Sequence, residues 1–146
     1  MEAVLERNNP AVLALLEKGA DPTLEDMYGG NALLYACGAS DVDAFSAVLE
    51  HALKKVDGDY SLALNAADQY GNTCLHKSAM SGSVAIVEEV VRLNESEGGF
   101  LDLSAKNEQG NTPSQLAQGL GDKAIVEALS KATAGQAREG EEKEEL

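Results

Sequence analysis

The chain has 146 residues, a formal net charge of −14 and only 4% aromatic residues. This length suits one domain. The charge argues against nucleic-acid binding, because contacts to a phosphate backbone need clusters of Lys and Arg. No apolar run approaches the ~20 residues of a membrane helix, and no secretory signal opens the sequence. We therefore expect neither a nucleic-acid nor a membrane partner, and a location in the cytoplasm, with the nucleus as a further compartment.

The two cysteines, Cys37 and Cys74, are too few to indicate a disulfide framework. A chain without a secretory signal is expected in a reducing compartment, where disulfides are rare. We therefore predict that both thiols are reduced and have a structural role.

Residues 1–24 form the first of four units along the chain. A short apolar helix over residues 3–5 precedes a second helix, which Asn9 can cap with Pro10 in its first turn, where a missing N–H costs nothing. Gly19 suits the left-handed residue that often ends a helix. The pattern predicts two consecutive short helices.

Residues 25–66 form the second unit. A first helix is predicted over residues 32–37, and Asp41 then caps a longer helix with one apolar face. The apolar residues of that longer helix are Ala44, Phe45, Val48, Leu49 and Leu53.

The third unit, residues 67–105, and the fourth, residues 106–133, repeat this plan. In the third unit Thr73 caps the first helix, and Ser83 caps the second. Candidate caps of the second helix stand at equivalent places in all four units: Asn9, Asp41, Ser83 and Asp122. Agreement between independent local features favours a repeated structure.

Two insertions and a charged end depart from the repeat. The extra residues fall near 56–64 and near 94–100, where they predict either loops on one face of the array or longer helices. We expect a longer helix followed by a turn in both places. Tyr60 and Phe100 then either cover the core or face a partner. Residues 134–146 are polar and lack apolar periodicity, which predicts a disordered acidic tail.

The third unit carries a recognisable motif. Residues 68–76 read D-Q-Y-G-N-T-C-L-H, and parts of the same pattern recur at 26–29 and 110–113. The stretch resembles the ankyrin repeat, D-x-x-G-x-T-P-L-H, and the resemblance extends over residues 1–133. It implies an all-α solenoid of about four helix-turn-helix repeats with β-turn fingers, although ankyrin repeats run about 33 residues and Asp68 lies 42 residues after Asp26.

The resemblance also implies what such an array does. Ankyrin arrays mostly display a binding surface, so we expect a protein–protein interaction module that acts as an adaptor or inhibitor, without enzyme activity or cofactor. The partner would be another protein, with a basic surface that complements the charge of −14. The chain would be monomeric by itself. The alternative is a chaperone for a basic client, such as a ribosomal protein or a histone.

The predicted binding site lies on the fingers and the concave face. In ankyrin repeats the two residues before the motif glycine stand at the finger tip, which implies that Tyr28 and Tyr70 are equivalent. Exposed aromatic residues are typical interface anchors, although each tyrosine could instead pack on its own finger. The predicted partner-binding residues are Met27, Tyr28, Gln69, Tyr70, Asn72, Met80, Ser81, Glu108 and Gln109.

The remaining polar candidates favour structural roles. The resemblance implies that His76 is buried and satisfies backbone groups between repeats. Leu34 and Gln115 replace this histidine in the neighbouring units, so the hydrogen bonds that link adjacent turns are expected to be lost there. With two histidines and no ligand spacing around them, neither a zinc site nor a catalytic set is predicted. Asn65 matches an asparagine that is hydroxylated in some ankyrin repeats.

Overall fold

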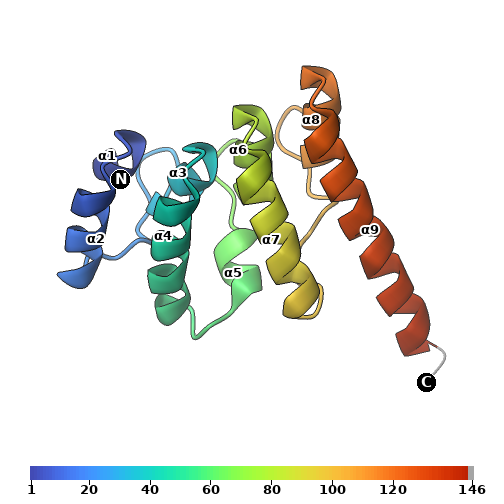
Figure 1. Ribbon diagram of the computed structural model, residues 1–146, viewed down its shortest axis with the longest axis horizontal. Coiled ribbons are helices and arrows are strands. Elements are labelled where there is room, and N and C mark those ends of the chain that lie inside the picture. The colour runs from blue at the N-terminus through green and yellow to red at the C-terminus, as the bar shows by residue number, and fades with distance from the viewer. Residues whose placement is uncertain (145–146) are drawn as a thin grey trace.

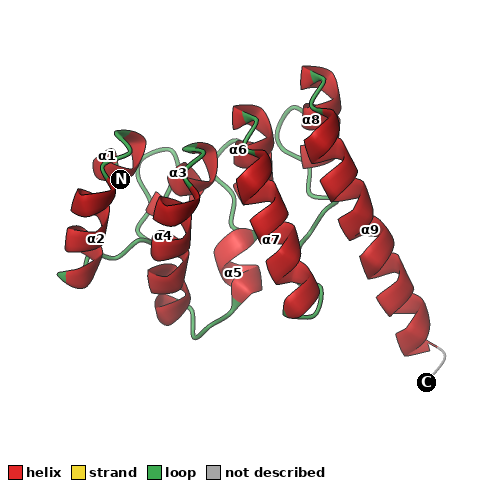
Figure 2. Ribbon diagram, in the orientation of Figure 1, coloured by secondary structure: helices red, strands yellow, loops and turns green. Residues whose placement is uncertain are grey.

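The computed structural model describes residues 1–144 of the chain. Within this range the chain forms helices joined by loops, with no strand (Figures 1 and 2). The helices are α1 (Glu2–Leu5), α2 (Asn9–Glu17), α3 (Ala32–Gly38), α4 (Val42–Lys55), α5 (Tyr60–Leu64), α6 (Cys74–Ser81), α7 (Val84–Ser96), α8 (Pro113–Leu120) and α9 (Lys123–Glu144). None of them is long and apolar enough to cross a membrane.

The helices form two layers that follow the chain from one end of the molecule to the other (Figure 1). The short helices α1, α3, α6 and α8 make one layer, in which α3 contacts α6 and α6 contacts α8. The longer helices α2, α4, α7 and α9 make the other layer, with contacts between each neighbouring pair. Because a single helix pair cannot bury its apolar face, stacking is what completes the core. The predicted all-α solenoid is confirmed.

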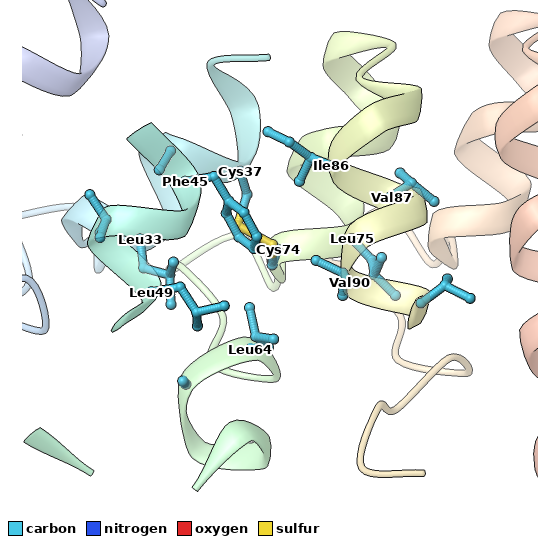
Figure 3. Packing of buried hydrophobic residues seen from close by; sticks show 14 of the residues in the cluster. Leu33, Cys37, Phe45, Leu49, Leu64, Cys74, Leu75, Ile86, Val87 and Val90 are labelled. Carbon is cyan, nitrogen blue, oxygen red and sulfur yellow. A yellow bond between two sulfur atoms is a disulfide. The ribbon is translucent and has the colours of Figure 1, made fainter. Parts of the chain in front are cut away.

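The core runs continuously between the layers (Figure 3). Phe45 is its largest fully buried side chain, and most other members are aliphatic. Ile86, Val87 and Val90 on α7 are completely buried, as the amphipathic pattern of the third unit predicts. Small and medium side chains suit the thin layers of such an array.

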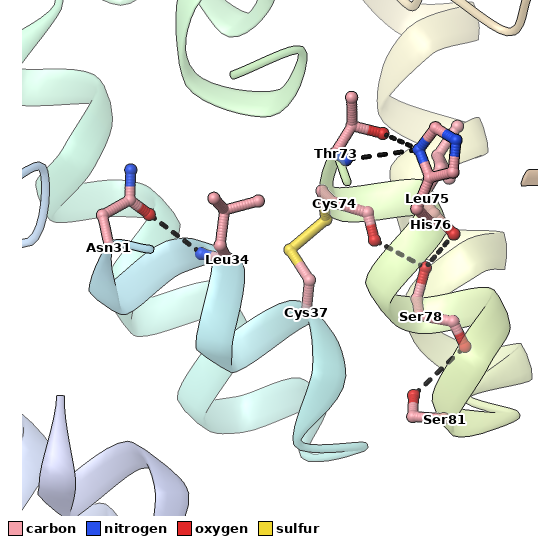
Figure 4. Close-up of a disulfide and its surroundings, with 9 residues drawn as sticks. All are labelled: Asn31, Leu34, Cys37, Thr73, Cys74, Leu75, His76, Ser78 and Ser81. Atoms are coloured by element: carbon pink, nitrogen blue, oxygen red, sulfur yellow. Dashed lines mark hydrogen bonds between the residues drawn. A yellow bond between two sulfur atoms is a disulfide. The ribbon is translucent and has the colours of Figure 1, made fainter. Parts of the chain in front are cut away.

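The prediction of reduced cysteines is wrong. Cys37 on α3 and Cys74 at the start of α6 form a disulfide, with the two Cα atoms 5.3 Å apart (Figure 4). Both residues are fully buried. The spacing along the chain gave no sign of this pair, because the two thiols meet only where α3 packs against α6.

Three of the four predicted helix caps stand where expected. The side chain of Asp41 accepts a hydrogen bond from the Ala44 N–H, and that of Asp122 accepts one from the Ile125 N–H. Ser83 stands at the N-cap of α7, although its side chain makes no capping bond within the described residues.

The prediction of the fourth cap, Asn9, is wrong by one residue. Asn8, one residue before the predicted Asn9, accepts the hydrogen bond from the Ala11 N–H. Asn9 instead donates from Nδ2 to Asp41 Oδ2 at 3.0 Å. The two adjacent asparagines therefore have different partners: Asn8 caps α2, and Asn9 contacts the cap of α4 in the next unit.

The two insertions pack against each other. The first adds the short helix α5 after α4, and the second follows the extended end of α7. The rings of Tyr60 and Phe100 lie 5.4 Å apart between centroids. Asn65 joins the insertions, since its Nδ2 donates to the Phe100 C=O and its Oδ1 accepts from the Asp102 N–H. A longer helix followed by a turn describes the second insertion, whereas α5 was not predicted.

The prediction of a disordered tail is wrong for residues 134–144, which continue α9; the last two residues of the predicted tail lie outside the described range. Ala132 is buried, and Gln136 Nε2 donates to the Leu101 C=O at 3.0 Å. The composition of this segment is polar, but it continues a helix that the array has already nucleated, so no new nucleation cost arises.

Candidate protein-binding surface

Three five-residue turns, here called the fingers, precede α3, α6 and α8. They span residues 26–30, 68–72 and 107–111. In each finger the first N–H donates to the fifth C=O at 2.8–3.1 Å, and the fourth N–H donates to the first C=O at 2.8–3.0 Å. The Oδ1 atom of the first side chain accepts two further backbone N–H groups, in Asp26, Asp68 and Asn107 alike. The three fingers therefore share one geometry.

Adjacent fingers are joined by one backbone hydrogen bond each. The Gln69 N–H donates to the Tyr28 C=O, and the Glu108 N–H donates to the Tyr70 C=O, both at 2.9 Å. Close approach requires glycine: a Cβ on Gly29 or Gly71 would lie 3.0 Å from the backbone of the next finger. Both glycines also have positive φ angles, of 70° and 73°. The two tyrosines thus stand in adjacent layers, as the motif predicted.

Most of the predicted binding residues are exposed. The exposed fractions of Met27 and Tyr28 are 82% and 49%, and those of Tyr70 and Met80 are 48% and 52%. The other exposed members are Gln69, Ser81, Glu108 and Gln109. Asn72 differs, because it is only 8% exposed and its Oδ1 accepts a hydrogen bond from Asn107 Nδ2 at 3.0 Å. That side chain helps to join two fingers.

Two hollows lie along the row of fingers. The first pocket has a volume of about 310 Å³ and is lined by Tyr28, Gly30, Leu34, Tyr35, Asp68, Tyr70 and Lys77. The second pocket has a volume of about 190 Å³ and is lined by Tyr70, Asn72, Met80, Asn107, Glu108, Gln109 and Leu116. The structure therefore brings five of the nine predicted residues together at the second pocket and two at the first, with Tyr70 shared.

Two residues of the first pocket, Tyr35 and Lys77, were not among the predicted binding residues. Tyr35 stands nine residues after Asp26 and donates from its hydroxyl to Asp26 Oδ2 at 2.5 Å. Lys77 stands nine residues after Asp68, and its Nζ lies 2.6 Å from Asp68 Oδ2. The signal in the sequence is the equal spacing, because each finger carboxylate has a side-chain donor nine residues after it.

These contacts keep the carboxylates ionised and the phenol neutral. The hydrogen bond from Tyr35 is the main cause that lowers the pKa of Asp26, and the same bond raises the pKa of Tyr35 to about 12. Burial alone would raise the pKa of Asp68, but hydrogen bonds from Lys77 and the Asn72 N–H outweigh it and lower that pKa. The lining of the pocket therefore carries the Asp68–Lys77 ion pair, and Asp26 adds a negative charge next to it through its bond with Tyr35.

His76 has the structural role that the resemblance implied. It is fully buried, and its Nδ1 accepts from the Thr73 N–H (Figure 4). Its Nε2 donates to the Asn111 C=O at 3.0 Å. Burial lowers the pKa of the imidazole, so it stays neutral. Leu34 at the equivalent place has no polar atom for such a bond, as predicted. Residues 1–144 contain no cluster of three His, Cys, Asp or Glu side chains that could hold a metal ion.

A third hollow is formed mostly by the first unit, with Ala32 and Val48 from the second, and no finger residue lines it. It has a volume of about 340 Å³, and most of its lining is apolar, including Val12, Leu15 and Leu24. Leu15 and Leu24 are 49% and 65% exposed. None of the predicted binding residues lines it.

Stacked helix pairs that present a row of equivalent fingers define a helical repeat protein. A family model described as ankyrin repeats (3 copies) matches residues 1–97 of the 146. The chain therefore belongs to the ankyrin-repeat family, whose members are protein–protein interaction modules. The geometry of the third finger and of α8 and α9 continues the repeat beyond the matched residues.

A curated relative lies within the same family. NF-kappa-B inhibitor alpha of Mus musculus is 32% identical to this chain over 87 residues, which are 59% of the chain and 27% of the relative. The chain thus spans about a quarter of that protein's length.

Proposed function

We propose that the chain binds a partner protein through its fingers and concave face, and that it acts as an adaptor or inhibitor by binding alone. The observation that carries this proposal is the row of exposed Met27, Tyr28, Tyr70 and Met80 side chains on adjacent layers. Tyrosine and methionine are enriched in protein interfaces. The backbone bonds between fingers hold this row rigid, so little ordering cost is expected on binding.

The inhibitor form of the proposal has support from the relative. That protein is named for inhibiting NF-kappa-B, and the similarity extends over 87 residues of this chain. A rigid surface that covers part of a partner can block the partner's other contacts without any chemical step.

The proposal is tested by affinity capture from an extract of the source organism. The wild type is compared with a Tyr28→Ser/Tyr70→Ser variant. A matched control, Leu13→Ser/Leu62→Ser, removes two exposed apolar side chains from α2 and α5, away from the fingers. We expect the tyrosine variant to lose the partner and the control to retain it. Equal loss in both variants, or retention in both, would refute the proposed surface.

The alternative function is a chaperone for a basic client. The observation that favours it is the end of α9, where Glu141, Glu142 and Glu144 are exposed. A chain truncated after Gln136 keeps the contact with Leu101 but lacks these acids. Basic proteins that bind the wild type, leave in high salt and fail to bind the truncated chain would support the chaperone. A partner that binds equally well in high salt and to the truncated chain would contradict the chaperone function and favour binding through the fingers.

A further inference from the structure

We propose that the first pocket receives an arginine side chain of the partner protein. This inference rests on the proposed function and specifies the chemistry of one contact within it. The pocket lies between the first two fingers, beside both exposed tyrosines.

The lining favours a flat cation. Three of the four tyrosines in the chain, Tyr28, Tyr35 and Tyr70, line this one pocket. A cation over an aromatic face is attracted by the negative face of the ring, and arginine makes this contact more often than lysine. The guanidinium group is planar and weakly hydrated, so it stacks on rings at a lower desolvation cost than an ammonium group.

The charges favour a cation over an anion. Asp68 and Lys77 line the pocket as an ion pair, and Asp26, which accepts the hydrogen bond from the lining residue Tyr35, adds one negative charge beside it. Both carboxylates have lowered pKa values, so both stay charged near neutral pH. The net charge of −14 also steers basic partners toward the molecule.

The second pocket provides the internal comparison. At the position equivalent to Asp68 it has Asn107, and at the position equivalent to Lys77 it has Leu116. No ion pair lines it, although Glu108 contributes one negative charge, and one tyrosine lines it rather than three. The two pockets therefore differ mainly in their aromatic lining. We expect the first pocket to bind a guanidinium in preference to the second.

The test uses N-acetyl-arginine methylamide as the probe and the ring signals of 13C-labelled tyrosine as the readout. The citrulline analogue is the control, because it has nearly the same shape without the charge. We expect arginine to shift the signals of Tyr28, Tyr35 and Tyr70 saturably, while Tyr60, which packs on Phe100, stays unchanged. Equal binding of the citrulline analogue, or preferential binding of the glutamate analogue to Lys77, would overturn the proposal.

Two charge variants sharpen the test. Asn107 makes the same Oδ1 contacts in the third finger as Asp68 makes in the second, so Asp68→Asn should keep the turn while removing the charge. We expect it to weaken arginine binding roughly threefold, and Lys77→Gln to strengthen it by a similar factor, in line with partly exposed ion pairs. A Lys77→Gln variant that binds arginine more weakly would contradict the assignment.

The outcomes separate this inference from the proposed function. If the Tyr28→Ser/Tyr70→Ser variant loses the partner but Asp68→Asn and the arginine probe have no effect, the finger surface stands and the arginine pocket fails. If the probe binds as expected but the tyrosine variant retains the partner, the pocket is real and the proposed function fails.

Discussion

The two joints between neighbouring fingers use the same backbone bond but different reinforcement. The first joint, between residues 26–30 and 68–72, precedes the two helices, α3 and α6, that the disulfide connects. The second joint, between residues 68–72 and 107–111, has no covalent link within the described residues. Instead, His76 donates to the Asn111 C=O, and Asn107 donates to Asn72. One joint is crosslinked, and the other relies on buried hydrogen bonds.

This difference shows that the backbone geometry of the fingers is constant, while the side chains around them vary. The three fingers keep one turn geometry, whether Asp or Asn occupies the first position. The residue nine places later changes from Tyr35 to Lys77 to Leu116, and it changes the chemistry of the adjacent pocket. A repeat array can therefore vary its binding surface while its fold stays constant.

The largest expected effect comes from breaking the first joint. The disulfide closes a segment with a sequence separation of 37 residues. A Cys37→Ala/Cys74→Ala variant should lose about 3–4 kcal/mol of unfolding free energy, because the crosslink no longer restricts the unfolded chain. Urea unfolding under oxidising conditions measures this loss.

Reduction provides the control for this variant. In excess dithiothreitol the stability of the wild type should approach that of the variant, because the reduced thiols no longer crosslink the unfolded chain. Equal unfolding midpoints of the two proteins under oxidising conditions would show that the disulfide contributes nothing.

The second joint should respond to the loss of its histidine. His76→Leu copies the first joint, where Leu34 holds the equivalent position. The change leaves the Thr73 N–H and the Asn111 C=O without their partner, which should cost about 2–3 kcal/mol. Gln115→Leu is the matched control in the fourth unit, where the Gln115 side chain is exposed and about 1 kcal/mol or less is expected. Equal costs would mean that the bond between layers adds no stability.

Alanine variants at the glycines of successive fingers can distinguish the cost of backbone strain from the cost of a steric clash with the next finger. Gly71 and Gly110 both have positive φ angles, so alanine should cost about 1 kcal/mol at either from backbone strain alone. A Cβ at Gly71 would also lie 3.0 Å from Asn107 Cα, whereas a Cβ at Gly110 meets nothing within 4 Å. We expect Gly71→Ala to cost about 2 kcal/mol in total. Equal unfolding free energies for the two variants would argue against close contact at the second joint.

The sequence could predict what is encoded within one unit. Thr73, Gly82 and the apolar face of α7 follow local rules of capping and periodicity, and the structure follows them. The motif glycines likewise predicted the fingers, and through them the adjacent placement of Tyr28 and Tyr70. The exposure of these two tyrosines could be predicted because the repeat determines which positions lie at the tip of each finger.

The errors concern contacts between units. The Cys37–Cys74 bond and the exchange of Asn9 for Asn8 both depend on how closely one helix pair approaches the next. Composition alone also misjudged residues 134–144, because the contact of Gln136 with Leu101 involves residues 35 positions apart. Such contacts have no local pattern in a single sequence.

The smallest expected effect is a pH dependence that belongs to the second joint. Burial holds the pKa of His76 below the ordinary 6.5, so the unfolded chain takes up a proton at a higher pH than the folded chain. The contribution of this neutral histidine is therefore complete above pH 6.5 and is lost as the pH falls below it, by at most about 1.4 kcal/mol per pH unit. The His76→Leu variant should lack this slope between pH 6.5 and 5. The lowered pKa values of Asp26 and Asp68 act in a separate window, because the stability they contribute is lost only as the pH falls below 3.8. Urea unfolding of both proteins across this range measures the difference, and parallel curves would mean that the unfolded and folded chains protonate this imidazole equally.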